Sequence, residues 1–394
     1  MEVDTGRGAA PNGRARRPEV LTGPVVLLLL AGFGGLSSFY LLLSVVPLYA
    51  VAGGAGDLGA GLTTGALMVS TVATELVMTR LLARLGYRLT MGLGLLLLGA
   101  PAFLLLLSSA LPLIVAVCLV RGAGLAIVAV TGSALVAELV RQERRGEGLG
   151  LYGVAVGVPA VVGLPLGVWL IPRVGYAPVF VAAAVAALAA VGAVAGLPAS
   201  RPAQASRDGV LAGLRTAELV RPSLVFLAVT LASGVVATFV PLAVPAESRR
   251  LVSLALLVQA VTATLARWAA GRFGDRRGNA GLLPPAVLAA AVGMAGLIWT
   301  ANPLALVAGM ALFGIGFGIA QNATLTLMFE RAPSSRYGTV STMWNLAYDA
   351  GIGIGAVGFG AVAELTGYST AFALTSALVF AALGVVWLDR RREG

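Results

Sequence analysis

Three ionisable residues lie inside long apolar stretches of this sequence, at Glu75, Arg121 and Asp349. A charge at membrane depth is costly, so such residues commonly serve binding or transport. Apolar surroundings favour the neutral form of a carboxyl group, which lets it load and release a proton across a gradient. We therefore predict proton-coupling roles for Asp349 and Glu75. The alternative for Asp349 is a structural acid that hydrogen-bonds a nearby amide or hydroxyl and holds its helix in place.

Arg121 keeps its proton under ordinary conditions, so it cannot itself be a proton carrier. It could bind an anionic group of a substrate, or keep a neighbouring carboxyl group charged until substrate displaces it. The alternative is a buried ion pair with an acid on a neighbouring helix, for which Glu75 is the candidate.

Neutral polar and aromatic side chains in the same apolar stretches are candidates to line a substrate site. An amide at membrane depth can bind substrate, although linking two helices is its more frequent role. Aromatic rings at helical spacing usually pack against other helices. The candidates are Gln321, Asn322, Asn345, Phe39, Tyr40 and Phe317, with Gln259, Phe226 and Phe239 as further members.

The composition does not support metal or nucleotide chemistry. The chain has no His and a single Cys, so a zinc or other transition-metal site is not expected. Its glycine-rich runs lie inside apolar stretches and lack the Lys-Ser/Thr pair of a phosphate loop. We expect no cofactor, no metal and no enzymatic activity. The energy for any transport must then come from an ion or substrate gradient.

The composition instead describes a polytopic membrane protein. Of the 394 residues, 58% are hydrophobic and 11% are charged, and apolar stretches long enough to cross a bilayer recur along nearly the whole chain. We expect an all-α fold with twelve transmembrane helices. Their expected ranges are 24–50, 59–82, 89–109, 112–137, 148–171, 177–197, 222–245, 250–270, 282–301, 303–329, 337–363 and 369–388.

The chain contains two copies of one unit, read in the same direction. The polar stretch 79–86 recurs at a constant offset as 271–278, and the same offset matches Glu138 with Glu330 and Arg144 with Arg336. We expect two pseudo-symmetric six-helix bundles, at 24–197 and 222–388. A cytoplasmic linker at 198–221 joins them. The tails at 1–23 and 389–394 are also cytoplasmic, and the first is disordered.

All 27 basic residues are arginines, and most lie between expected helices on the side that carries the termini. The positive-inside rule then places both termini in the cytoplasm and the protein in the inner (plasma) membrane. The arginines are not gathered on one face interleaved with aromatic residues, so nucleic acid is not an expected partner.

The same offset places Glu75 of the first half opposite Arg267 of the second. Equivalent positions of opposite charge could form a cytoplasmic gate that opens and closes as the halves rock. The alternative is that each side chain pairs locally or extends to the membrane surface. We expect both polar stretches, 79–86 and 271–278, to be tight loops between helices.

Two parallel six-helix repeats with such loops resemble the major facilitator superfamily, over residues 20–390. The second half keeps the family's signature between helices 2 and 3, at Gly271, Asp275, Arg276 and Gly278. The first half keeps part of it, at Arg84 and Gly86, with Thr79 and Ala83 in place of Gly and Asp. In the family that Asp pairs with a neighbouring helix end and helps to latch the outward-facing state. The resemblance therefore implies a working latch around Asp275.

Two further segments resemble family motifs. Arg121, with Gly122 and Gly124, is similar to the intramembrane Arg-Gly motif of helix 4. Helix 5 resembles the Gly-Pro motif typical of the family's exporters, at Gly157, Pro159, Gly163, Pro165 and Gly167. The resemblance also implies a central cavity lined by helices 1, 4, 7 and 10, which favours Gln321 and Asn322 among the amides.

These observations predict a secondary transporter that exports a small organic or amphiphilic molecule, such as a drug or metabolite, in exchange for protons. The halves would alternate access to a site near the midplane. Its partners are a small-molecule substrate, protons and the lipid bilayer, and a monomer suffices because the two halves complete a cavity. One alternative is proton-coupled uptake of a sugar or similar solute. Another is a non-transporting membrane sensor or scaffold.

Overall fold

The computed structural model describes residues 21–141, 144–201, 216–245, 248–333 and 336–390, and within these ranges the chain is almost entirely helical. An apolar chain in a bilayer must satisfy its backbone hydrogen bonds internally, which helices achieve. The first half contains α1 (Gly23–Leu43), α2 (Val45–Ala52), α3 (Gly56–Glu75), α4 (Met78–Gly99), η1 (Ala100–Leu106), α5 (Leu111–Leu139), α6 (Arg145–Val174) and α7 (Tyr176–Val194).

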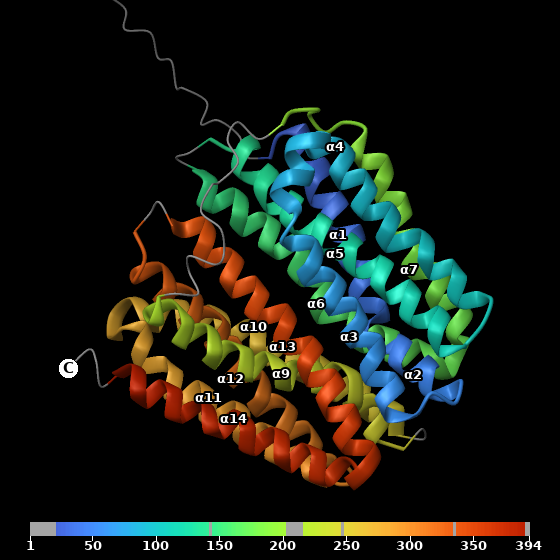
Figure 1. The fold of residues 1–394 in the computed structure, drawn as a ribbon, viewed down its shortest axis with the longest axis vertical. Helices are drawn as coiled ribbons and strands as arrows, with labels where there is room; N and C mark the ends of the chain where they lie inside the picture. The colour runs from blue at the N-terminus through green and yellow to red at the C-terminus, as the bar shows by residue number, and fades with distance from the viewer. Residues whose placement is uncertain (1–20, 142–143, 202–215, 246–247, 334–335, 391–394) are drawn as a thin grey trace, which may run out of the picture.

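The second half repeats this order. It contains α9 (Ala217–Ala243), α10 (Arg249–Arg277), η4 (Asn279–Leu282), α11 (Leu283–Gly296), η5 (Leu297–Trp299), α12 (Pro303–Glu330), α13 (Tyr337–Thr366) and α14 (Tyr368–Arg390). Figure 1 shows the halves as two bundles side by side. Helix α9 begins inside the range expected for the linker. Most of that linker, nearly all of the first tail and the last residues fall outside the described ranges.

The expected twelve-helix membrane fold is confirmed. Among the described residues, eleven helical segments are long and apolar enough to cross a membrane. The remaining pass begins with α3, which carries Asp57 in its first turn and buries Thr63, Thr64 and Thr71. Helix α3 packs against α5 and α13, so protein rather than lipid surrounds much of it. An inner helix of this kind tolerates more polar residues than the others.

The polar stretches 79–86 and 271–278, expected to be loops, are helical over most of their length. Helix α10 continues to Arg277 and turns at Gly278, whose φ is 83°. In the first half, α4 begins at Met78, and only Gly86, with a φ of 75°, interrupts it. A helix satisfies its own backbone bonds even beyond the apolar region, so a polar sequence alone does not end it. The expected loops were therefore wrong, and each reduces to one turn-forming glycine.

The two halves meet mainly where α3 packs on α13 and α6 packs on α10. The α3–α13 contact depends on glycine, because a side chain on Gly61 would meet the carbonyl of Ala356. Gly65 and Gly353 lie in the same contact, against Val357 and Met68 respectively. Small residues allow close helix approach in a membrane, so this seam joins the halves at backbone distance.

We expect Gly61→Ala to lower the melting temperature of the purified protein by a few degrees, because overpacking a close contact costs about 1–3 kcal/mol. Gly358→Ala, on α13, is the matched control, since an added methyl group there meets nothing within 4 Å. A Gly61→Ala protein that melts with wild type would show that the seam is looser than described.

Candidate functional site

The carboxyl groups of Glu75 and Asp349 interact directly across the boundary between the two halves. Asp349 lies in α13 and is only 8% exposed, while Glu75 is the last residue of α3. The Oε2 atom of Glu75 is buried and has no hydrogen-bond partner among the described residues. Two carboxylates at this range repel each other, and one proton bound between them relieves the repulsion. Glu75 and Asp349 therefore stay the candidates for the predicted proton-coupling role.

The position of Glu75 differs from the expected one. It was expected inside helix 2, about two turns before the helix end, but α3 ends at Glu75 and the chain turns at 76–77 before α4 begins. A carboxyl group at a helix break is less constrained by its own helix, which leaves it free to face α13.

Two tyrosines and an arginine surround the acid pair. The hydroxyl groups of Tyr40 on α1 and Tyr348 on α13 interact, and Asp349 and Arg267 lie within electrostatic range of both tyrosines. Four helices, α1, α3, α10 and α13, thus bring their polar side chains together at the boundary between the halves. Arg267 is exposed and makes no ion pair with Glu75 among the described side chains. Its predicted gate role stays a prediction.

Aromatic rings of the second half form a wall beside Tyr348. The ring centroid of Tyr348 lies 5.9 Å from that of Phe226, 6.0 Å from that of Trp344 and 6.4 Å from that of Phe317. Trp344 in turn stacks on Phe226 at 4.5 Å. Phe317 was among the candidates expected from the sequence, and Trp344 and Tyr348 were not. Their spacing of four residues, directly before Asp349, is the signal that could have found them.

The other predicted polar and aromatic residues are spread more widely. Asn322 lies beside Gly271 of α10, inside the second half, and its Oδ1 atom is buried without a partner in the described part of the chain. Gln321 and Asn345 are partly buried. Phe239 packs on Phe359 and Tyr368, away from the acid pair.

The side chain of Arg121 is buried inside the first half, where the residue is only 1% exposed. Its guanidinium donates hydrogen bonds to the carbonyl oxygens of Ser38 at 3.0 Å and Leu98 at 2.5 Å, and a longer one of 3.5 Å to the Ser38 hydroxyl. The alternative considered for Arg121, an ion pair with Glu75, is absent among the described side chains, and Glu75 faces Asp349 instead. Carbonyl groups meet the donor needs of the guanidinium, so Arg121 ties α5 to α1 and α4.

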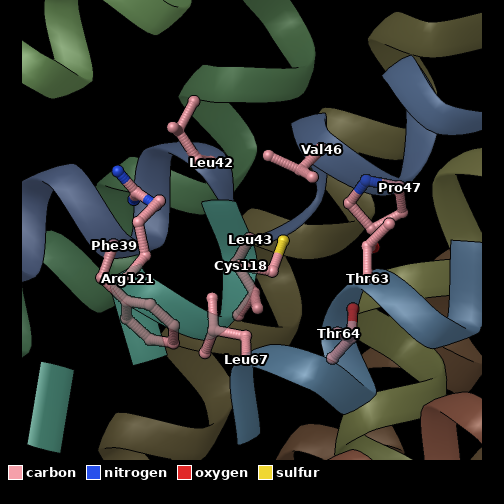
Figure 2. Close-up of a pocket in the computed structure, with 10 residues that line it drawn as sticks. All are labelled: Phe39, Leu42, Leu43, Val46, Pro47, Thr63, Thr64, Leu67, Cys118 and Arg121. Atoms are coloured by element: carbon pink, nitrogen blue, oxygen red, sulfur yellow. The ribbon is translucent and has the colours of Figure 1, made fainter. Parts of the chain in front are cut away.

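Arg121 and Phe39 also line a small pocket between α1, α2, α3 and α5. Figure 2 shows them on one side, Thr63 and Thr64 on the other, and Cys118 between. Its volume of about 10 Å³ fits roughly one water molecule. In this conformation the pocket is therefore too small for an organic substrate.

The exporter-like segment of α6 packs against α1. A side chain on Gly167 would meet the carbonyl of Leu41, and one on Gly163 would lie 2.9 Å from the Tyr40 Cβ. Pro159 and Pro165 lie within the helix, and Gly157 faces open space.

The predicted cytoplasmic latch is described only in part, because the side chains of Asp275 and Arg276 lie outside the described residues. Gly271 faces Asn322, and Arg84 is exposed beside the turn at Gly86.

Besides the contacts of the acid cluster, four hydrogen bonds between the halves gather at one end of the bundles, among the described residues. This is the end remote from the linker, and we call the bonds there the far-end contacts. The bonds are Ser44 Oγ to the Ala237 carbonyl at 2.5 Å, Thr64 to Thr238 at 2.9 Å, Leu58 N to Glu364 Oε2 at 3.0 Å, and the Tyr368 hydroxyl to Asp57 Oδ1. The described residues make no such bond at the linker end. The halves are thus held closed at the far end.

We expect the double variant Tyr368→Phe/Glu364→Gln to separate the halves at the far end, because it removes the hydroxyl donor to Asp57 and the charge that accepts from Leu58. Spin labels at the exposed positions Leu107 and Leu304 would report this as a longer distance in pulsed electron paramagnetic resonance. Thr366→Val is the matched control, since the Thr366 hydroxyl bonds only its own helix, at Val362. Unchanged distances in the double variant would contradict a holding role for these contacts.

The family model for the Major Facilitator Superfamily matches residues 27–356. The fold is similar to that of the nucleoside transporter NupG (D323A mutant), with a TM-score of 0.75 and 12% identity, covering 93% of this chain and 99% of that one. The partially occluded inward-open xylose transporter XylE from E. coli gives 0.74 and 13%, covering 93% and 97%. No curated protein matches. The chain belongs to the Major Facilitator Superfamily.

Proposed function

We propose that this transporter exports a small organic or amphiphilic molecule, such as a drug or metabolite, in exchange for protons. The observation that carries the proposal is the contact between Glu75 and Asp349 across the boundary of the two halves. A proton-coupled transporter needs a proton site whose occupancy changes the relative energy of its conformations. A carboxyl pair split between the moving halves supplies such a site.

The energy of the α3–α13 contact depends on the proton count of this pair. With one proton bound, one carboxyl group can donate a hydrogen bond to the other and hold the halves together at this level. With none bound, two negative charges repel in surroundings of low dielectric constant. Loss of the proton therefore favours separation of α3 from α13 around Glu75. Both Asp349 and Glu75 act in this coupling.

The far-end contacts set the direction of access. If the linker is cytoplasmic, as the arginine distribution predicts, these contacts close the extracellular end and the structure faces inward. Delivery of substrate to the outside then requires the far-end contacts to break and the linker end to close. Rocking of one bundle against the other around the acid pair performs this exchange.

Two features support export of an amphiphile. The wall beside the acid pair consists of aromatic rings, at Phe226, Phe317, Trp344 and Tyr348. The α6 segment that packs on α1 resembles the Gly-Pro motif of exporters. Every group in the acid cluster comes from one chain, so a monomer suffices. No cofactor or metal is needed, because the carboxyl groups carry the proton.

A second candidate is proton-coupled uptake of a small polar solute. It is favoured by the similar solved structures, which include a nucleoside transporter and a D-xylose-proton symporter, the latter with a TM-score of 0.75 at 13% identity. Sequence identity at this level supports the shared fold but does not indicate the substrate, which depends on the residues of the site. Gln321 and Asn345 are the amides that such a solute would use.

We expect cells that express the protein to accumulate less of at least one amphiphile from a panel of dyes, antibiotics and metabolites. The effect should disappear in Asp349→Asn and when a protonophore collapses the gradient. The variant removes the ionisable group and keeps the shape of the side chain, so the pair can no longer gain and lose charge at this position.

Glu147→Gln is the matched control, because Glu147 is an exposed acid whose partner among the described side chains is the neighbouring Arg144 on the surface. Membrane levels of all variants must match. Higher accumulation in wild-type cells would replace export by uptake. Equal accumulation in all strains, including the empty control, across the whole panel would favour the sensor or scaffold.

A further inference from the structure

An apolar groove runs along the outer side of the second half, between α10 and α12, and encloses about 440 Å³. The two helices pack together, as Figure 1 shows. Three of the α10 residues that line it are alanines, at 266, 269 and 270, and their small side chains leave the hollow. Two larger α10 residues also line it, and they are exposed, Leu265 at 60% and Phe273 at 53%. Exposed apolar rims of this kind face lipid in a membrane protein.

The groove has the length of one membrane leaflet. Its α10 wall extends from Thr262 to Phe273, which is about 16 Å at the helical rise. Half of a hydrocarbon core about 30 Å thick is about 15 Å. Phe273 lies one residue before the end of the apolar span Arg250–Gly274, so the groove begins at the membrane surface and ends near the midplane. One acyl chain of a lipid in the linker-end leaflet fits this path.

A positive charge stands at the surface end of the groove. The Arg272 guanidinium carbon lies 3.8 Å from the ring centroid of Trp268, and Arg272 follows the wall residue Ala269 by three positions, on the same side of the helix. Arg272 is exposed and has no acidic partner among the described side chains. Tryptophan favours the level of the lipid headgroups, and stacking on it holds the guanidinium there.

We infer that this groove is a binding site for one anionic phospholipid. Its acyl chain fills the alanine-walled hollow and its phosphate accepts hydrogen bonds from Arg272. A guanidinium can donate two parallel hydrogen bonds to phosphate oxygens. A headgroup with a net negative charge also neutralises the positive charge of Arg272. The site lies outside the acid cluster and is independent of the transported substrate.

The inference can be tested by native mass spectrometry of the whole protein in mixed micelles. The micelles contain equal amounts of dioleoyl phosphatidylglycerol, which is anionic, and dioleoyl phosphatidylcholine, which has no net charge. Wild type should retain one phosphatidylglycerol with a preference of about fivefold over phosphatidylcholine, as expected for one basic residue at the surface. Arg272→Gln should remove this preference. Ala269→Leu should fill the hollow and reduce retention of both lipids.

Arg173→Gln is the matched control, since Arg173 also stacks on a tryptophan, at 3.5 Å from the Trp169 ring, but on α6 at the far end. It should retain lipid as wild type does. Equal retention of the two lipids by wild type would overturn the inference, and so would unchanged phosphatidylglycerol occupancy in Arg272→Gln. The latter substitution is at an exposed position, so this test holds even if Ala269→Leu does not fold.

Discussion

Repulsion between two carboxyl groups is the interaction on which the proposed coupling in this transporter depends. Glu75 and Asp349 belong to different halves of the chain, and the glycine-rich seam between α3 and α13 brings them together. At that range in apolar surroundings the pair is stable with a proton between the groups and unfavourable without one. In the proposed function, the gain or loss of one proton thereby acts on the contact that a rocking motion must change.

The rest of the site is arranged around that pair. Among the described residues Arg121 hydrogen-bonds carbonyl and hydroxyl oxygens, so it stiffens the first half and does not pair with either acid. Tyr40 and Tyr348 bring hydroxyl groups next to the acids, and the rings of Trp344, Phe226 and Phe317 keep the neighbouring surface apolar. The far-end contacts close the opposite end by two neutral hydrogen bonds, which contribute about 1 kcal/mol each, and by two bonds to carboxylates, which contribute about 1.5–3 kcal/mol each.

The sequence indicated which residues lie inside the membrane, but it did not indicate which helices lie beside one another. A carboxylate in an apolar run must lie inside the membrane, and this identified Glu75 and Asp349. Which helix lies opposite each acid depends on packing between segments far apart in the chain, and a one-dimensional pattern does not contain it. The alternative considered for Arg121, an ion pair with Glu75, is not found among the described side chains for that reason. The internal repeat and the twelve passes were predictable because they follow from hydrophobicity and a constant offset alone.

Local structure at the polar turns was misjudged for a different reason. The stretches 79–86 and 271–278 are rich in arginine and glycine, which is typical of loops, but arginine is a good helix former and only the positive-φ glycines at 86 and 278 force a turn. Trp344 and Tyr348 were overlooked because aromatic residues in apolar runs usually pack. Tyr348 directly precedes Asp349, and Trp344 lies one turn before Tyr348. This proximity to the acid distinguishes them from aromatic residues that only pack.

The pH dependence of the distance between the halves at the linker end tests most directly whether protonation of the acid pair controls their separation. Spin labels at the exposed positions Arg84 and Arg336 report it by pulsed electron paramagnetic resonance. We expect the distance to shorten as the pH falls and the pair takes up its proton, and we expect Glu75→Gln/Asp349→Asn to abolish this shift. A distance that does not depend on pH in wild type, or a full shift in the double variant, would contradict the proposed coupling.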